Sequence, residues 1–138
     1  MTKTSTNTEN QGVYFDLTAL FASLNQRFFD NKISAQIKWG QRRKVMGLKK
    51  RSLKMGSYHP YDRSIIINPC LDQAIVPKIC VERILFHEMA HQKFPVKKGK
   101  NGKNIIHYRE FYDFEKNYPY LEQADLWIKA NLDRLLRF

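Results

Sequence analysis

Residues 81–91, VERILFHEMAH, decide the fold, because they predict the helix against which the rest of the chain has to pack. When this stretch is wound as a helix, apolar side chains occupy nearly every side, which is typical of a helix inside a fold. Pro77 suits the first turn and Pro95 ends the helix, so we expect it to run to about residue 94. Two histidines and a glutamate in such a helix are costly to bury without partners, so their presence calls for a chemical explanation.

His87 and His91 are four residues apart in this helix. Both imidazoles therefore project from one face, about one turn apart, and can take adjacent corners of a zinc tetrahedron. Glu88 is displaced too far to be the natural third ligand, but it can take a proton from a water molecule that zinc has activated. The pattern predicts zinc as the cofactor, the two histidines as ligands and Glu88 as the catalytic general base.

A catalytic zinc usually has three protein ligands and one open position. We predict His107 as the third ligand, because the chain between it and His91 is long enough to return to the metal. A carboxylate from a later helix is the alternative. The candidate carboxylates are Glu110, Asp113 and Glu115. His59 stands beside Pro60 in a predicted turn, which indicates an exposed or substrate-side residue more than a ligand.

Smaller elements flank the central helix. Apolar residues recur at helical spacing over 16–29, which predicts an amphipathic helix with Asp16 as its cap. An alternating run and a β-branched run predict two short strands, and a short extended piece before a His-Pro-Tyr-Asp turn predicts a third. Further helical patterns follow the central helix. The predicted strands cover 35–39, 55–58 and 64–68, and the later helices cover 107–117 and 120–136. We therefore expect an α+β fold in which a three-stranded or slightly larger sheet packs on the central helix, with additional N- and C-terminal helices.

The length of 138 residues allows one compact core. We expect a single domain over 13–138 behind a disordered polar tail over 1–12. No apolar run in that tail resembles a signal peptide, and charged residues interrupt every hydrophobic segment, so we expect no membrane span. Only Cys70 and Cys80 are present, which excludes a disulfide framework and a cysteine zinc ribbon. A monomer in the cytoplasm fits these features best.

The chain carries 24 Lys and Arg against 13 Asp and Glu, a net charge of +11. A field of this sign attracts polyanions, and nucleic acid is the natural partner. The cations concentrate over 42–54 and 93–103, which we expect to be basic loops able to contact phosphates. The alternative is that each segment is a solvated loop whose lysines serve solubility.

On these residues the chain resembles the SprT-like (Spartan-type) zinc metallopeptidases. Residues 25–39 look like the family's opening helix and strand, 56–58 and 65–68 look like its next two strands, and 81–91 look like its active-site helix. Residues 107–111, HYREF, resemble the segment that bears its third histidine ligand. The resemblance implies a minimal zincin fold and DNA-linked proteolysis, which would give the positive charge a purpose. It also implies zinc ligands at His87, His91 and His107 and a catalytic Glu88.

These features predict a zinc-dependent metalloendopeptidase that hydrolyses peptide bonds of cytoplasmic and, under the resemblance, DNA-associated proteins. If the strand over 55–58 is the sheet edge beside the metal helix, an extended peptide can pair with it and lie across the zinc. Two alternatives stay open. One is a nucleic-acid-binding module with a closed structural zinc site, which a fourth protein ligand would favour. The other is a zinc hydrolase of a non-peptide substrate, because ligands and base do not encode the substrate.

Overall fold

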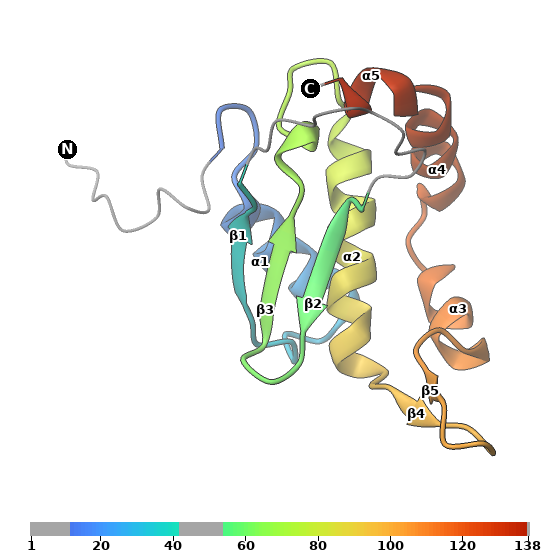
Figure 1. Ribbon diagram of the computed structural model, residues 1–138. Coiled ribbons are helices and arrows are strands. Elements are labelled where there is room, and N and C mark those ends of the chain that lie inside the picture. The colour runs from blue at the N-terminus through green and yellow to red at the C-terminus, as the bar shows by residue number, and fades with distance from the viewer. Residues whose placement is uncertain (1–11, 42–53, 138) are drawn as a thin grey trace.

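The computed structural model describes residues 12–41 and 54–137, which form a mixed α+β fold around a small three-stranded sheet (Figure 1). The helices are α1 (Leu17–Phe28), α2 (Lys78–Lys93), α3 (Arg109–Glu115), α4 (Leu121–Ala130) and α5 (Leu132–Leu136), with a 3-10 turn, η2 (Pro69–Leu71). The strands are β1 (Gln36–Trp39), β2 (Gly56–His59), β3 (Ser64–Ile67), β4 (Lys97–Lys98) and β5 (Asn104–Ile105). The predicted tail over 1–12 and the predicted basic loop over 42–54 lie almost wholly outside the described residues.

The first helix, α1, forms where its apolar spacing and its cap predict it. The carboxylate of Asp16 accepts hydrogen bonds from the backbone N–H groups of Thr18 and Ala19, at 3.1 and 3.4 Å, so the predicted cap is confirmed. Beyond the helix, Asp30 and Asn31 have φ angles of 53° and 59°, in the left-handed region that ends a helix. The chain then turns back into β1.

The sheet has the strand order β1-β3-β2. β1 runs parallel to β3, and β2 runs antiparallel to it, with Gly56 opposite Ile67 and His59 opposite Ser64. Ile65 and Ile67 of the central strand are fully buried, which explains their β-branched run. Within the described part of the chain, β2 pairs on one side only, so it forms an edge of the sheet beside α2.

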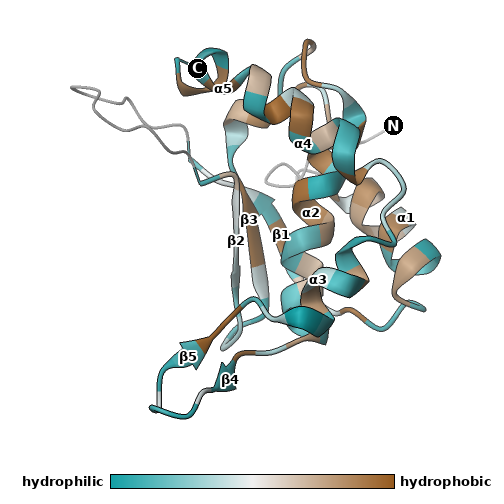
Figure 2. Cartoon of the chain, turned by 90° about the vertical axis from the view of Figure 1, so that its right-hand side faces the viewer, coloured by the Kyte–Doolittle hydropathy of each residue, from teal (hydrophilic) through white to brown (hydrophobic). Residues whose placement is uncertain are grey.

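The long helix α2 lies against the sheet, with α1 on the same side of the strands (Figures 1 and 2). Phe86 is fully buried and its ring is close to four other aromatic rings, with centroid distances of 5.1 to 5.6 Å. Those rings belong to Phe28, Phe29, Phe114 and Tyr118. The aromatic cluster fastens α2 to α1 and to the chain around α3. α2 is therefore held from two sides at the turn that carries the histidines.

Two predictions about the later chain are wrong in detail. Part of the predicted basic loop over 93–103 belongs to a small antiparallel hairpin, in which Lys97 pairs with Ile105, and Gly102 supplies a φ of 73° near its tip. The predicted helix over 120–136 is broken at Asn131, whose side-chain amide donates to the Trp127 carbonyl oxygen at 2.9 Å and so ends α4. In the described residues, no helix combines the length and the apolar character needed to cross a membrane.

Candidate metal centre

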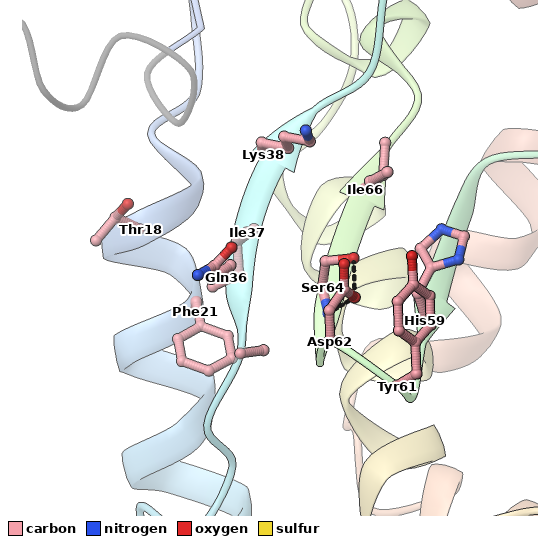
Figure 3. A pocket seen from close by; sticks show the side chains of 11 residues that line it. Thr18, Phe21, Gln36, Ile37, Lys38, His59, Tyr61, Asp62, Ser64 and Ile66 are labelled. Atoms are coloured by element: carbon pink, nitrogen blue, oxygen red, sulfur yellow. Dashed lines mark hydrogen bonds between the residues drawn. The ribbon is translucent and has the colours of Figure 1, made fainter.

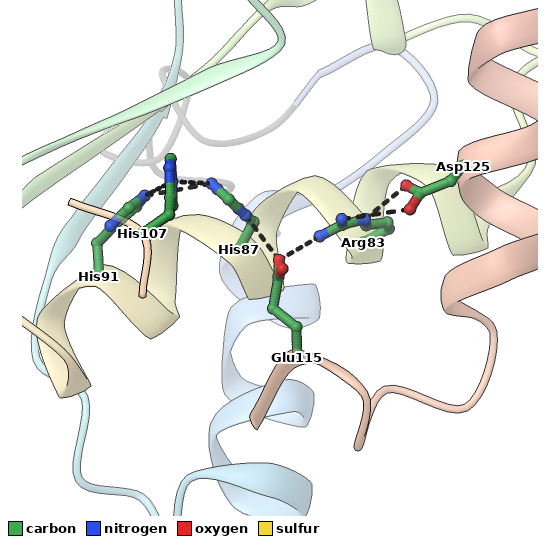
Figure 4. A network of polar contacts seen from close by, with 6 residues as sticks. All are labelled: Arg83, His87, His91, His107, Glu115 and Asp125. Carbon is green, nitrogen blue, oxygen red and sulfur yellow. Dashed lines mark hydrogen bonds and ion pairs between the residues drawn. The ribbon is translucent and has the colours of Figure 1, made fainter. Parts of the chain in front are cut away.

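Three histidine side chains converge at the end of α2. The Nε2 atoms of His87, His91 and His107 are each 3.2 Å from the other two (Figure 4). The first two come from one face of α2, and the third comes from the segment just before α3. Among the described residues, these three form the one group of His, Cys, Asp or Glu side chains close enough to hold a metal ion. The structure thus brings together the three histidines that the sequence predicts as metal ligands.

The spacing of the three nitrogen atoms fits a tetrahedral metal ion. Zinc–nitrogen bonds of about 2.0–2.1 Å place two corners of a tetrahedron roughly 3.3–3.4 Å apart, close to the spacing found here. Hydrogen bonding cannot account for the arrangement, because each Nε2 either carries a proton or offers a lone pair. In a triangle of three such atoms, at least two have the same role. A shared cation removes that conflict.

Packing around Phe111 explains how His107 reaches the other two histidines. The Phe111 ring is fully buried, and its centroid lies 5.0, 4.7 and 5.0 Å from those of His87, His91 and His107. The hydroxyl of Tyr108 also donates a hydrogen bond to the carbonyl oxygen of Pro95 at 2.7 Å. The start of α3 is therefore tied both to the helix that carries two histidines and to the chain that leaves it.

A buried carboxylate orients the first histidine. The Nδ1 atom of His87 lies 2.6 Å from an oxygen of Glu115, a residue that is 4% exposed. With the Nδ1 proton donated to this carboxylate, the Nε2 lone pair faces the other histidines, which is the tautomer a metal ligand needs. Burial alone would raise the pKa of Glu115, but the hydrogen bond from His87 and the charge and hydrogen bond of Arg83 lower it. Glu115 therefore holds the His87 ring in the orientation that metal binding would require.

Arg83 extends this support to α4. Its guanidinium donates to Glu115 at 2.6 Å and to the two carboxylate oxygens of Asp125 at 2.7 and 3.3 Å (Figure 4). The chain of contacts therefore runs from α4 through Arg83 and Glu115 to the ring of His87. Arg83 and Asp125 were not predicted for this site, and Glu115 was predicted only as an alternative ligand. Arg83 stands four residues before His87, on the same face of the helix, and that spacing is the signal that points to it.

The other two candidate carboxylates lie away from the histidines. Glu110 contacts Lys97 at 3.6 Å, and Asp113 contacts Arg109 at 3.6 Å. Both side chains are more than half exposed. Neither belongs to the group of side chains that can hold a metal. Between His107 and the later carboxylates as third ligand, the geometry therefore favours His107.

Glu88 lies beside the histidines and is 6% exposed. Burial raises the pKa of Glu88 to about 7, although the charges of His87 and Lys54 oppose the rise. Gly56 of β2 allows the close approach, because a Cβ atom there would lie 3.2 Å from both Cγ and Oε2 of Glu88 and 2.9 Å from Cγ2 of Ile84. A carboxyl group with a pKa near neutrality can accept and release a proton under ordinary conditions.

The pKa values of two histidines are lowered. Burial, with the neighbouring charges of His87 and His107, lowers the pKa of His91 to about 4. Burial also lowers the pKa of His107, and the charge of His87 adds to the effect. Both rings are therefore held neutral near pH 7, and the neutral ring is the form that binds a metal.

The histidines open onto a cleft of about 760 Å³. One wall is the edge strand β2 with Pro60, and the other is formed by Pro95, Val96 and Ile106. His59 is half-buried in the first wall and its Nε2 lies 3.1 Å from the Ser57 hydroxyl, outside the metal group. The cleft gives an extended molecule access to the three imidazoles and to Glu88.

A second groove of about 680 Å³ lies over the three strands beside α1 (Figure 3) and shares only His59 with the cleft. Its acidic member, Asp62, already accepts hydrogen bonds from the backbone N–H and the hydroxyl of Ser64, at 3.1 and 2.8 Å. No metal-holding group of described residues lies there. Within the described residues, the group able to hold a metal therefore lies in the cleft with the histidines and not in this groove.

Comparison with known proteins gives no match to a family model, to a curated protein or to a solved structure. A function for the chain therefore has to come from the geometry of its own residues.

Proposed function

We propose that the chain is a zinc-dependent metalloendopeptidase of the SprT-like type, with a minimal zincin arrangement of helix and sheet. One observation carries the proposal: three histidine Nε2 atoms stand 3.2 Å apart in an open cleft, with a buried glutamate beside them. His87, His91 and His107 would hold the metal. Zinc held there would supply a Lewis acid for a peptide carbonyl and acidify an attacking water.

Glu88 is the residue of this chain that moves the proton. Its pKa of about 7 suits a group that takes a proton from the attacking water and returns it to the leaving amine. A cation held by the three histidines would lower that pKa, which would favour the ionised form of Glu88. Gly56 leaves the space in which the carboxyl group sits.

The edge strand β2 supports a peptide as the substrate. The strand lines the cleft from Gly56 to His59 and, within the described residues, has no partner on its outer side. Free N–H and C=O groups along such an edge can pair with an extended chain. A peptide held in this way would cross the face of the three histidines.

Two further features bear on the competing functions. The three histidines have no fourth His, Cys or carboxylate in their group among the described residues, and the cleft reaches them, which favours an open site over a closed structural one. The net charge of +11 and the lysines of the β4–β5 hairpin support DNA-associated proteins as substrates.

The test compares the wild type with Glu88→Gln, a variant that keeps the ligands. Both proteins are assayed for zinc content and for cleavage of casein and of a DNA-binding protein, with and without DNA. We expect one zinc in each, cleavage by the wild type alone, and faster cleavage of the DNA-binding protein when DNA is present. If both bind zinc and neither cleaves under any of these conditions, the peptidase proposal fails. If neither binds zinc, the metal centre itself fails.

A further inference from the structure

The wall opposite the edge strand is apolar and open to solvent. Val96 and Ile106 are each 47% exposed, although they are large hydrophobic residues in a strongly charged chain. Both line the cleft, together with Pro95. Single exposed apolar residues are common, but two that face a cleft containing a metal-ligating group indicate a binding surface.

The hairpin fixes these two side chains next to the histidines. β4 pairs with β5 so that Lys97 is opposite Ile105. Continuing this register by one residue sets Val96 opposite Ile106, at the base of the hairpin. Ile106 directly precedes His107 in the chain. The apolar wall and the third histidine are therefore positioned by the same short segment.

Val96 and Ile106 lie at the base of the hairpin, outside the paired residues Lys97–Lys98 and Asn104–Ile105. Within the hairpin, the side chain of Ile105 lies over Gly99, since a Cβ added at Gly99 would be 3.0 Å from its Cδ1 atom. The base of the hairpin is instead anchored by Tyr108, through its hydrogen bond to Pro95 and through Lys97, whose Nζ lies 4.1 Å from the ring centroid. The two exposed side chains can thus be changed without removing the contacts that hold the hairpin.

Across the cleft from Val96 and Ile106, the wall formed by β2 can contact a bound peptide through both its backbone and its side chains. Tyr58, His59 and Pro60 line it, and the Tyr58 hydroxyl accepts a hydrogen bond from Gln92 Nε2 at 3.1 Å. A strand-paired peptide presents its side chains alternately to either side of its backbone. One of them, close to the bond over the histidines, would lie between this wall and the apolar pair.

We propose that Val96 and Ile106 form a specificity subsite that binds one apolar side chain of an extended peptide, at a residue directly adjacent to the bond that is cut. This subsite rests on the proposed peptidase function. The occupant is a peptide because the cleft joins a strand edge, which needs backbone partners, to an apolar wall, which needs an aliphatic or aromatic side chain.

The test is a degenerate peptide library digested by the zinc-loaded protein, with cut sites read by mass spectrometry. The variants are the double substitution Val96→Ser/Ile106→Ser, the single substitution Ile106→Lys, and Ile75→Ser as the matched control. Ile75 is also 47% exposed but lies before the other end of α2. Zinc content is measured for each protein.

We expect the wild type and Ile75→Ser to enrich Leu, Ile, Val, Met or Phe at one position adjacent to the cut. The double variant should keep its zinc, lose the enrichment and cleave a matched leucine peptide about tenfold less efficiently in kcat/KM, with an alanine peptide unaffected. Ile106→Lys should shift the preference towards acidic residues, a gain that misfolding cannot produce. Cleavage without an apolar preference, or a preference that survives in the double variant, overturns the subsite and leaves the peptidase standing. No cleavage by the wild type overturns both.

Discussion

Replacing Glu88 with glutamine in the metal-free protein should raise the free energy of unfolding at pH 8 and change it little in acid. Glu88 is 6% exposed, and burial raises the pKa of its carboxyl group from 4.5 to about 7. The folded state therefore holds a proton that the unfolded state releases as the pH rises from 4.5 to 7. Stability is lost over that window, because the unfolded chain then binds fewer protons than the folded one. Glutamine cannot ionise, so the variant avoids the loss.

The magnitude follows from the size of the pKa shift. The shift from 4.5 to about 7 corresponds to about 3 kcal/mol, since one pKa unit is worth about 1.4 kcal/mol. By the same relation, the loss is about 1 kcal/mol at pH 5 and is nearly complete at pH 8. The advantage of the variant over the wild type should therefore grow by about 2–3 kcal/mol between these two pH values.

Urea unfolding at pH 5 and pH 8, in the presence of a chelator, measures this difference. Glu122→Gln is the control, because Glu122 is exposed in the first turn of α4, away from the cleft. The control should differ from the wild type by the same small amount at both pH values. If the advantage of Glu88→Gln is the same at pH 5 and pH 8, the carboxyl group is not held in a desolvated site, and the reasoning from its burial is refuted.

Three other changes have expected results. Glu115→Gln should weaken zinc binding about 10–100-fold in competition with a chelating dye, because it removes the carboxylate that orients His87. The exposed Glu110→Gln should leave zinc binding unchanged, and equal affinities of the two variants would show that Glu115 does not contribute to zinc binding. Gly56→Ala should keep its zinc and lower kcat on the order of tenfold, because the new Cβ displaces the Glu88 side chain. An undiminished kcat would show that the close approach of Gly56 to Glu88 is unimportant for catalysis. Phe86→Ala should cost about 3–5 kcal/mol in urea unfolding, and a loss under 1 kcal/mol would contradict the aromatic packing around α2.

Local patterns were enough to predict the main elements and the three histidines. The first helix and β1 follow from apolar periodicity and β3 from a β-branched run, and Asp16 caps α1 where its position beside the helical pattern predicts. β2, with the sequence GSYH, has no such pattern and is predicted from the turn that follows it. The histidine pair follows from a four-residue spacing, which any helix converts into a common face. Once the pair was recognised, few residues elsewhere in the chain could complete it.

The rest depends on contacts between segments that are distant in the sequence. The β4–β5 hairpin is rich in lysine and has no alternating apolar pattern, so it reads as a loop, and its pairing is visible only in the fold. Glu115 looked like a possible ligand because carboxylates bind zinc. Its place at the Nδ1 side of His87, and the link through Arg83 to Asp125, follow from how α3 and α4 pack on α2.

The most direct test of the central claim is a titration of zinc into the chelated, metal-free wild-type protein, with casein cleavage measured at each step. If the three histidines hold one zinc and Glu88 is the general base, as proposed, cleavage should rise in proportion to added zinc and reach a plateau at one zinc per chain. His107→Ala, assayed in parallel, should show a far weaker dependence with no break at that ratio. A wild-type protein that binds one zinc without gaining any cleavage, or that cleaves equally well before zinc is added, would contradict the account.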